Sequence, residues 1–490
     1  MRKARTGGGL SAGALAWSLF EGARNPFVVL VTIYVFMPYF SSVVVGDPIR
    51  GQQAVATYGQ WSGIIVALSA PILGATVDRI GARKPLLLLV TGLMIPLIWS
   101  LWWTRPDHRG LSVGAVIVIA AAINILFAYS EVLHNSMLIR AAGARRAHAA
   151  SGLALALGNL ISVSVLVFVL WAFVLPAAIP GFVPHAPLFG LDSRQHEPSR
   201  IVAPISATIL AVGALPLFLL TADAPSTGLP LGRALAEGAG SIAAMLRRLK
   251  GRRDATAFLL SRMLYIDAMT GVLLFAGVYA GGVMHWGVLQ LLAYGVLLSV
   301  LAVAGGVLGG VMDHRLGPKI AVRIEIGVTV VGLVALLGMA PDRILFFWPA
   351  DPTHAVWNGP MFKSAPELIY LVIAAAVSIF ITASYASSRT LLTRLTPPEE
   401  TGAFFGLYAL SGTATVWMGS ALVLVATHVT RTQQAGFAAL AVLMALGLAG
   451  LFFVRGGGRD VEADGPGLSS AAVGLSQRSG WSSPPVSTRI

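Results

Sequence analysis

Ionisable side chains inside apolar segments are the residues of this sequence best suited to chemistry. Glu21 and Arg24 lie three residues apart, so they share one face of a helix, and Glu131 has His134 at the same spacing. A carboxylate in apolar surroundings can take up and release a proton, and a guanidinium can bind a second carboxylate. These residues predict proton binding or recognition of a charged solute. The alternative for Glu21 and Arg24 is a structural pair that only neutralises itself.

The candidate residues fall in the first, fourth, seventh and tenth apolar segments. Asp267 and Glu131 lack an opposite charge at helical spacing, although His134 could pair with Glu131, and both are our preferred proton-coupling residues. Arg262 and Arg389 lie near segment ends, where an arginine can instead anchor at the membrane surface or contact a latch loop. The full set of substrate or coupling candidates is Glu21, Arg24, Asn124, Glu131, His134, Asn135, Arg262, Tyr265, Asp267, Tyr385 and Arg389.

The composition describes a chain that faces lipid over most of its surface. Of the 490 residues, 56% are hydrophobic and only 11% are charged, against roughly 25% charged residues in a soluble protein. This excludes a soluble enzyme, a disordered protein and a fibrous protein. Cysteine is absent, which excludes disulfides, thiol catalysis, thiolate metal sites and iron–sulfur clusters.

Apolar segments long enough to cross a bilayer must position these candidates. A span needs about 20 mostly apolar residues, and strict period-two alternation, the mark of a membrane barrel, is missing. We therefore predict an all-α membrane protein with twelve transmembrane helices. The predicted spans are 13–39, 55–77, 85–103, 112–138, 150–178, 202–222, 256–281, 288–311, 322–340, 366–389, 402–427 and 435–454.

The basic residues of the loops indicate the orientation. With the N-terminus inside, the inside loops and tails hold 24 Lys and Arg residues and the outside loops hold 8. By the positive-inside rule both termini are cytoplasmic. The net charge of +13 is then explained by topology, so no nucleic-acid partner is expected. We expect the inner (plasma) membrane of a bacterium.

The chain divides into two halves, 1–222 and 256–454, joined by a cytoplasmic linker, 223–255. Basic and apolar residues alternate along 231–253, which favours an amphipathic helix on the membrane surface; the alternative is a solvated linker. Residues 455–490 are rich in Gly, Ser and Pro and are predicted to be disordered.

A short motif occurs at the same place in each half. Leu73-Gly74 precedes Asp78-Arg79, and Leu308-Gly309 precedes Asp313. Each copy continues to an Arg, a Gly and a closing basic residue. We interpret both loops as conformational latches that do not bind substrate; the alternative is a positive-inside loop that stops a helix. The latch residues are Gly74, Asp78, Arg79, Gly81, Arg83, Lys84, Gly309, Asp313, Arg315, Gly317 and Lys319.

The repeated loop resembles the cytoplasmic signature of the major facilitator superfamily. A narrower resemblance is to the "unknown major facilitator" family, which includes the autophagy-linked vacuolar amino-acid effluxers. It rests on Ala16-Trp17, on Leu264-Tyr265-Ile266-Asp267 and on Phe404-Phe405-Gly406-Leu407-Tyr408. The first span departs from the family pattern at Glu21, where Asp is usual, and the fourth span lacks the family's Pro after Asn135-Ser136-Met137-Leu138.

The resemblance implies two pseudo-symmetric six-helix halves whose first, fourth, seventh and tenth helices line a central cavity. We therefore expect a secondary transporter that works by alternating access on a small polar or zwitterionic solute. Amino-acid efflux with proton coupling is the first choice, and a monomer is expected to function. The alternatives are efflux of an amphiphilic drug or lipid-like solute, a membrane-embedded transferase acting on a lipid carrier, and a non-transporting scaffold.

Signals of enzyme chemistry are weak. The glycines of Gly238-Ala239-Gly240 meet a loose dinucleotide fingerprint, but no strand precedes them. No Walker sequence is present, and the nine His residues lack metal-ligand spacing. We expect no ATP, no cofactor, no metal ion and no enzymatic activity.

The charge bias predicts the sidedness of the loops. Reporter fusions at residues 110, 190 and 350 are expected to report the outside, and fusions at the termini and in 223–255 the inside. A fusion at 110, 190 or 350 that reads as cytoplasmic would contradict the twelve-span topology.

The latch interpretation predicts the behaviour of Asp78→Asn. The substitution is expected to slow transport while substrate affinity stays nearly unchanged, because the loop biases conformations and lies outside the cavity. Substrate binding and exchange rate, measured on the same purified variant, separate the two effects. A large loss of affinity at a normal exchange rate would instead place Asp78 in the binding site.

Overall fold

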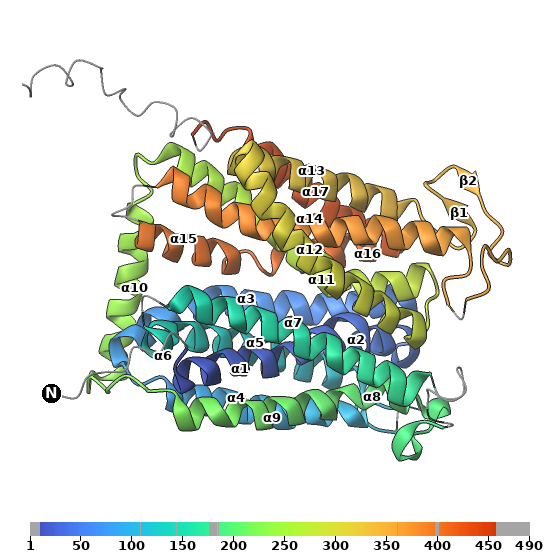
Figure 1. Ribbon diagram of the computed structural model, residues 1–490, viewed down its shortest axis with the longest axis horizontal. Helices are drawn as coiled ribbons and strands as arrows, with labels where there is room; N and C mark the ends of the chain where they lie inside the picture. The colour runs from blue at the N-terminus through green and yellow to red at the C-terminus, as the bar shows by residue number, and fades with distance from the viewer. Residues whose placement is uncertain are drawn as a thin grey trace, which may run out of the picture.

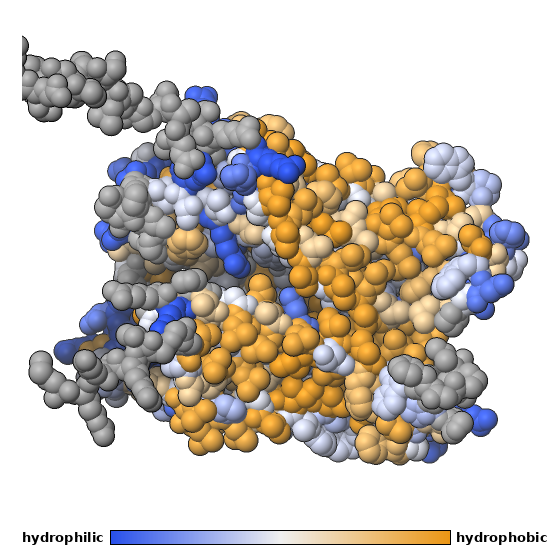
Figure 2. All heavy atoms as spheres, in the orientation of Figure 1, coloured by the Kyte–Doolittle hydropathy of each residue, from blue (hydrophilic) through white to orange (hydrophobic). Residues whose placement is uncertain are grey.

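The computed structural model describes residues 10–107, 109–143, 146–175, 184, 186–359, 361–396 and 401–456. Within these residues, twelve helical stretches are long and apolar enough to cross a membrane, which confirms the predicted fold class. Figure 2 shows apolar side chains over the middle of the molecule and hydrophilic ones gathered toward both ends of its long axis.

The first six spans form the lower layer in Figure 1. Their elements are α1 (Ala12–Pro26), η1 (Phe27–Tyr34), α2 (Phe36–Tyr39), η2 (Phe40–Val44), α3 (Pro48–Ile80), α4 (Lys84–Ser100), η3 (Leu101–Trp103), α5 (Val113–Ser136), α6 (Leu138–Ala142), α7 (Ala147–Val169), η4 (Leu170–Val174), η5 (Leu188–Gly190), η6 (Ser193–Gln195), α8 (Glu197–Arg200) and α9 (Val202–Leu220).

The last six spans form the upper layer. Their elements are α11 (Arg253–Val283), α12 (Val288–Leu316), α13 (Pro318–Leu337), α14 (Ala365–Leu395), α15 (Thr401–Thr413), α16 (Met418–Thr430) and α17 (Gln433–Leu451). Between α13 and α14, strands β1 (Arg343–Ile344) and β2 (Trp348–Pro349) form a short antiparallel hairpin that pairs Ile344 with Trp348.

Local sequence signals begin several helices. The Asp47 carboxylate accepts a hydrogen bond from the Arg50 N–H at 2.7 Å, directly before Pro48 opens α3. Ser112 caps α5 and Thr432 caps α17 in the same way. Ser364 and Glu367 form a capping box at the start of α14. These caps satisfy N–H groups that have no partner within the helix.

Equivalent helices pack in equivalent ways in the two layers. In the first, α1 packs on α7 and α9, and α3 packs on α5; in the second, α11 packs on α17 and on α15 and α16, and α12 packs on α14. Between the layers, α3 contacts α16 and α7 contacts α12. The two layers are thus related by a pseudo-twofold repeat, in agreement with the predicted halves; the exact domain boundaries stay a prediction.

The layers touch closely at one end of the molecule. The Gln52 amide of α3 donates to the Thr427 hydroxyl of α16 at 2.8 Å and to the Gln433 carbonyl at 3.1 Å. A Cβ on Gly277, near the end of α11 on this side, would collide with the Ile33 carbonyl of η1, so only glycine permits this approach. We call this the Gln52 end. The opposite end, which carries α10 (Leu231–Arg247), is called the α10 end.

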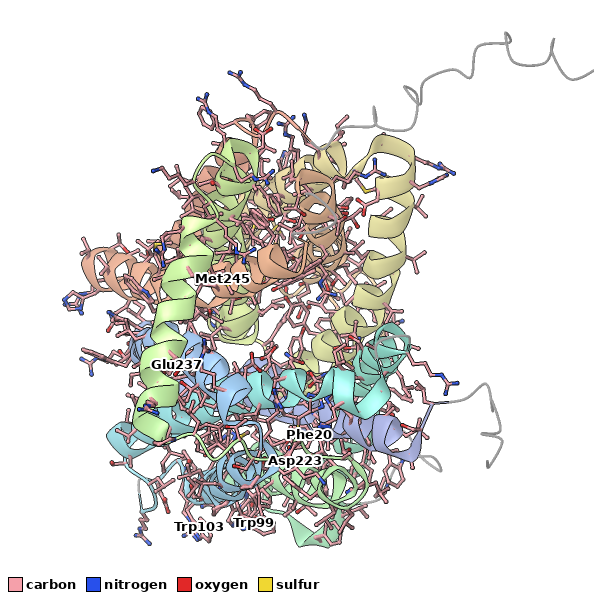
Figure 3. The ribbon with its side chains drawn as sticks, turned by 90° about the vertical axis from the view of Figure 1, so that its left-hand side faces the viewer. Phe20, Trp99, Trp103, Asp223, Glu237 and Met245 are labelled. Carbon is pink, nitrogen blue, oxygen red and sulfur yellow. The ribbon has the colours of Figure 1, made fainter. Side chains whose placement is uncertain are left out.

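Helix α10 crosses from the first layer to the second, as Figures 1 and 3 show. It packs on α3 and on α15, and Glu237 lies 3.4 Å from Arg79 of α3. The predicted helix in the linker is therefore present. Its place on a membrane surface stays a prediction.

Two spans are less regular than the sequence predicts. The first continues to Val44 through two π-helical segments, whereas the prediction ended at 39. The eleventh was predicted as one helix over 402–427 but is interrupted between Thr413 and Met418. The predicted end of the fifth span beyond residue 175 and the tail beyond 456 lie outside the described residues.

Candidate functional site

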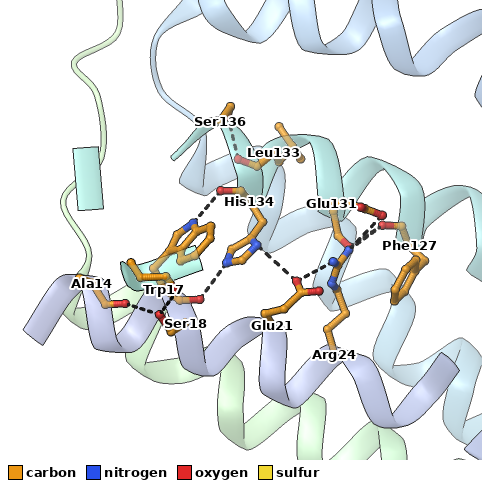
Figure 4. Close-up of polar contacts among 12 residues, drawn as sticks. Ala14, Trp17, Ser18, Glu21, Arg24, Phe127, Glu131, Leu133, His134 and Ser136 are labelled. Atoms are coloured by element: carbon orange, nitrogen blue, oxygen red, sulfur yellow. Dashed lines mark hydrogen bonds and ion pairs between the residues drawn. The ribbon is translucent and has the colours of Figure 1, made fainter. Parts of the chain in front are cut away.

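A charged cluster joins α1 to α5, as Figure 4 shows. One terminal nitrogen of Arg24 lies 2.6 Å from the Glu21 carboxylate, and the other lies 3.9 Å from the Glu131 carboxylate. That second nitrogen also donates to the Phe127 carbonyl and the Ser130 hydroxyl, each at 3.3 Å. The guanidinium carbon lies 4.3 Å from the centre of the Phe127 ring. Arg24 is therefore held on every side by α1 and α5.

His134 connects the cluster to Trp17. Its Nε2 lies 2.8 Å from the Trp17 carbonyl, and the Trp17 indole donates to the His134 carbonyl at 2.7 Å. The two rings stack at 4.2 Å. Because a carbonyl only accepts, Nε2 carries the proton, and Nδ1 then faces the Glu21 carboxylate at 3.5 Å. A neutral His134 therefore turns the lone pair of Nδ1 toward the Glu21 carboxylate.

The cluster has one more acid than it has permanent cations. With Glu21 and Glu131 ionised and His134 neutral, Arg24 leaves a net charge of −1. The Arg24 side chain is buried, whereas that of Glu21 is 28% exposed and that of Glu131 is 52% exposed. The acid that reaches open space is therefore Glu131, and it can accept one positive charge.

Two cavities lie beside this cluster, between the layers. One of about 380 Å³ is bordered by Val132 of α5, by helix α15 and by Asp78 and Arg79, so the first latch adjoins it. Another of about 200 Å³ is bordered by Asn124 and Phe127 of α5 together with residues of α11. Glu131 lies on α5 between these two stretches of cavity wall, after Phe127 and directly before Val132.

Arg262 of α11 is held in the same way as Arg24. Its terminal nitrogen donates to the Tyr408 carbonyl and the Ser411 hydroxyl, both at 2.7 Å, and its guanidinium carbon lies 3.5 Å from the Tyr408 ring centre. Unlike Arg24, it has no carboxylate within 4 Å in the described part of the chain. Arg262 is therefore a buried cation that lacks an anion.

Asp267 lies five residues further along α11 and is buried. Its carboxylate accepts the Gly419 N–H of α16 at 2.8 Å. Gly419 is in the first turn of α16, directly after the break in the eleventh span. Arg262 thus places a cation near the C-terminal end of α15, and Asp267 places an anion at the N-terminal end of α16. These are the charges that the dipoles of the two helices favour.

The remaining candidates do not gather at one point. The Tyr265 hydroxyl lies 2.8 Å from the Ser388 hydroxyl in a buried contact between α11 and α14. Tyr385 is half-buried, whereas Asn135 and Arg389 are exposed. Arg24 and Asp267 each already have a protein partner, in α1 and α16 respectively.

Both latch loops contain a glycine with positive φ directly after the helix. Gly81 after α3 and Gly317 after α12 have φ of 91° and 81°, a conformation that favours glycine. In the first loop, the Arg83 guanidinium contacts Asp78 at 2.9 Å and donates to the Ser136 hydroxyl at 2.8 Å. The Asp223 carboxylate accepts the N–H groups of Arg83 and Lys84 at the start of α4.

These contacts join the first latch to α5 and to the linker. Lys84 also donates to the Phe218 carbonyl. Arg79, Arg83 and Lys84 therefore all contact protein groups. In the second loop, Lys319 donates to the Arg455 carbonyl at 2.8 Å.

Sequence reasoning missed one buried acid. Glu325 of α13, which is not among the predicted candidates, is fully buried and accepts the Ser387 hydroxyl of α14 at 2.9 Å. The signal that would have found it is an acid inside the predicted span 322–340.

The contact between Asp267 and Gly419 predicts a stability difference between two variants. Asp267→Ala leaves the Gly419 N–H without its acceptor in an apolar region, at a cost of about 1–3 kcal/mol. Asp267→Asn keeps an acceptor oxygen and is expected to retain most of the stability. Thermal unfolding of the purified protein measures both, with Asp351→Ala in an exposed loop as control. Equal stability of all three variants would show that the contact does not stabilise α16.

Comparison with known proteins agrees with this architecture. Residues 58–462 match the family model described as "Vacuole effluxer Atg22 like". The uncharacterized MFS-type transporter YxiO of Bacillus subtilis (strain 168) is 20% identical over 457 residues, which cover 90% of this chain and 94% of that protein.

Solved structures share the fold. A structure of the nucleoside transporter NupG superposes with a TM-score of 0.61 at 12% identity, covering 91% of this chain and 100% of that one. The inward-open xylose transporter XylE from E. coli gives 0.57 at 13% identity, covering 91% and 95%. The chain is a multi-pass membrane transporter of the major facilitator type and not an enzyme, and it belongs to the vacuole effluxer Atg22-like family.

Proposed function

We propose that this protein exports a small zwitterionic solute, with an amino acid as the first candidate, in exchange for protons. The observation that carries the proposal is the cluster of Arg24, Glu21 and Glu131. Its net charge of −1 is neutralised by one proton or by one substrate ammonium group. Because both would bind at the exposed acid, Glu131, they compete, and competition of this kind is what couples two opposite fluxes.

The carboxylate of the solute needs a cation in the other layer. Arg262 lacks an ion-pair partner among the described residues, and it contacts α15 at Ser411, next to Leu410 on the wall of the 380 Å³ cavity. A solute lying between the two cavities, beside the stretch of α5 from Phe127 to Val132, would direct its ammonium group to Glu131 and its carboxylate toward Arg262. Cavities of about 200 and 380 Å³ suit a solute at or below the roughly 300–1,000 Å³ of drug-sized sites.

Alternating access would use the two ends of the molecule. The Gln52 end is closed by hydrogen bonds and close glycine contacts between the layers, whereas the 380 Å³ cavity lies at the α10 end. With the orientation predicted from the loop charges, this is an inward-facing arrangement. The family description "effluxer" supports export as the direction.

The proposal predicts a specific defect in Glu131→Gln. The variant keeps the shape of the side chain but cannot carry the proton. In proteoliposomes it is expected to lose solute accumulation driven by a pH gradient, while exchange of labelled for unlabelled solute persists. Asp351→Asn, an exposed loop acid, is the matched control. Accumulation at the wild-type level with unchanged pH dependence would reject Glu131 as the coupling residue.

A comparison of two ligands separates carboxylate binding by Arg262 from a purely structural role. Arg262→Gln is expected to weaken binding of an amino acid at least tenfold and to leave binding of the corresponding decarboxylated amine nearly unchanged. Equal weakening of both ligands would mean that Arg262 acts only by supporting α15.

A further inference from the structure

An apolar crevice of about 570 Å³ lies between the two layers, apart from the charged cluster. Its walls are Leu68 and Pro71 of α3, Leu260 and Met263 of α11, and Leu246 of α10, with α15 completing the lining. Only two hydroxyl side chains reach it, and both are engaged. Thr256 donates to the Arg252 carbonyl, and Ser411 is bonded to Arg262. The crevice therefore offers little to a polar solute.

The crevice is open toward the surroundings of the spans. Leu68 is 70% exposed, Leu260 is 58% exposed, and Leu246 is 48% exposed. Leu68 and Leu260 lie inside the spans Pro48–Ile80 and Arg253–Val283, where the surroundings are the hydrocarbon of the bilayer. An alkyl chain can thus enter from the lipid without crossing water.

A cationic segment borders the same crevice at the α10 end. Leu246, Leu249 and Thr256 line it, and the residues between them include Arg247, Arg248, Lys250 and Arg253, all exposed. No acid occurs from residue 238 to 253, and Asp254 is already bonded to the N–H groups of Arg455 and Gly456. The positive charge is therefore available to an anion at the membrane surface.

We propose that the crevice binds one acyl chain of an anionic membrane phospholipid, whose phosphate lies on the basic segment from Arg247 to Arg253. The apolar walls fit the chain, the exposure of Leu68 and Leu260 gives it a route from the bilayer, and the basic segment selects the headgroup. Because α3 belongs to the first layer and α11 and α15 to the second, the bound lipid contacts both layers.

Native mass spectrometry of the detergent-purified full chain tests the proposal. Phosphatidylglycerol is expected to remain bound at about one molecule per protein, with at least fivefold preference over phosphatidylcholine of the same chains. Replacing Arg247, Arg248 and Lys250 together by Gln is expected to remove this preference. The control triple, Arg140→Gln with Arg315→Gln and Arg394→Gln, removes equal charge at residues that do not adjoin the crevice and is expected to keep it.

The chain site is tested separately with Ala67→Phe, which fills the crevice from α3. It is expected to reduce binding of both lipids at least fivefold, whereas Gly92→Phe, which adds bulk at an open position of α4, is not. Thermal unfolding checks that each variant is folded. Retention of lipid in Ala67→Phe, or no preference for phosphatidylglycerol in the wild type, would overturn the proposal.

The crevice shares Pro71, Ile242 and Leu410 with the 380 Å³ cavity, so lipid binding is tested separately from transport. Binding is measured without solute, so Glu131→Gln is expected to retain the lipid even if it has lost transport. Loss of lipid in Glu131→Gln would mean that the bound lipid occupies the charged cavity instead of the crevice.

Discussion

A cation inside hydrocarbon must find protein groups that replace its water, and this constraint shapes the interior of the molecule. Arg24, Arg262 and Arg200 meet it in one manner, by donating to the carbonyl of an aromatic residue whose ring also faces the guanidinium. Each contact fixes one helix against another, α1 on α5 and α11 on α15. The buried arginines therefore hold in place the helices that bear the candidate site residues.

The two layers differ in how they balance these charges, and the proposed function depends on that difference. The first layer surrounds Arg24 with two acids, whereas the second leaves Arg262 with neutral partners and uses its acid, Asp267, to cap α16. The two halves of a repeated fold thus differ: one places two acids around its buried cation, and the other leaves its cation without an acid within 4 Å among the described residues. A dipolar solute would be oriented by such a pair.

Periodic and compositional features of the chain could be predicted from sequence, because lipid imposes them on every span. The twelve helices and the Glu21–Arg24 pair follow from hydropathy and from a spacing of three residues. The partners of Asp267 and Glu325 could not be found in this way, since Gly419 and Ser387 lie far along the chain and carry no charge. The break after Thr413 was missed because no Pro marks it and because its contact, from the Thr415 hydroxyl to the Met263 carbonyl of α11, joins residues far apart in the sequence.

Helix α10 limits the distance between the two layers at the α10 end. Its 17 residues form a rod of about 25 Å that is joined to α3 through Glu237 and Arg79 and runs through a short turn into α11. A rod of this kind can tilt but cannot stretch, because lengthening it would break its internal hydrogen bonds. The two layers can therefore approach each other at this end when α10 tilts toward the membrane plane. Their greatest separation is limited by the length of α10.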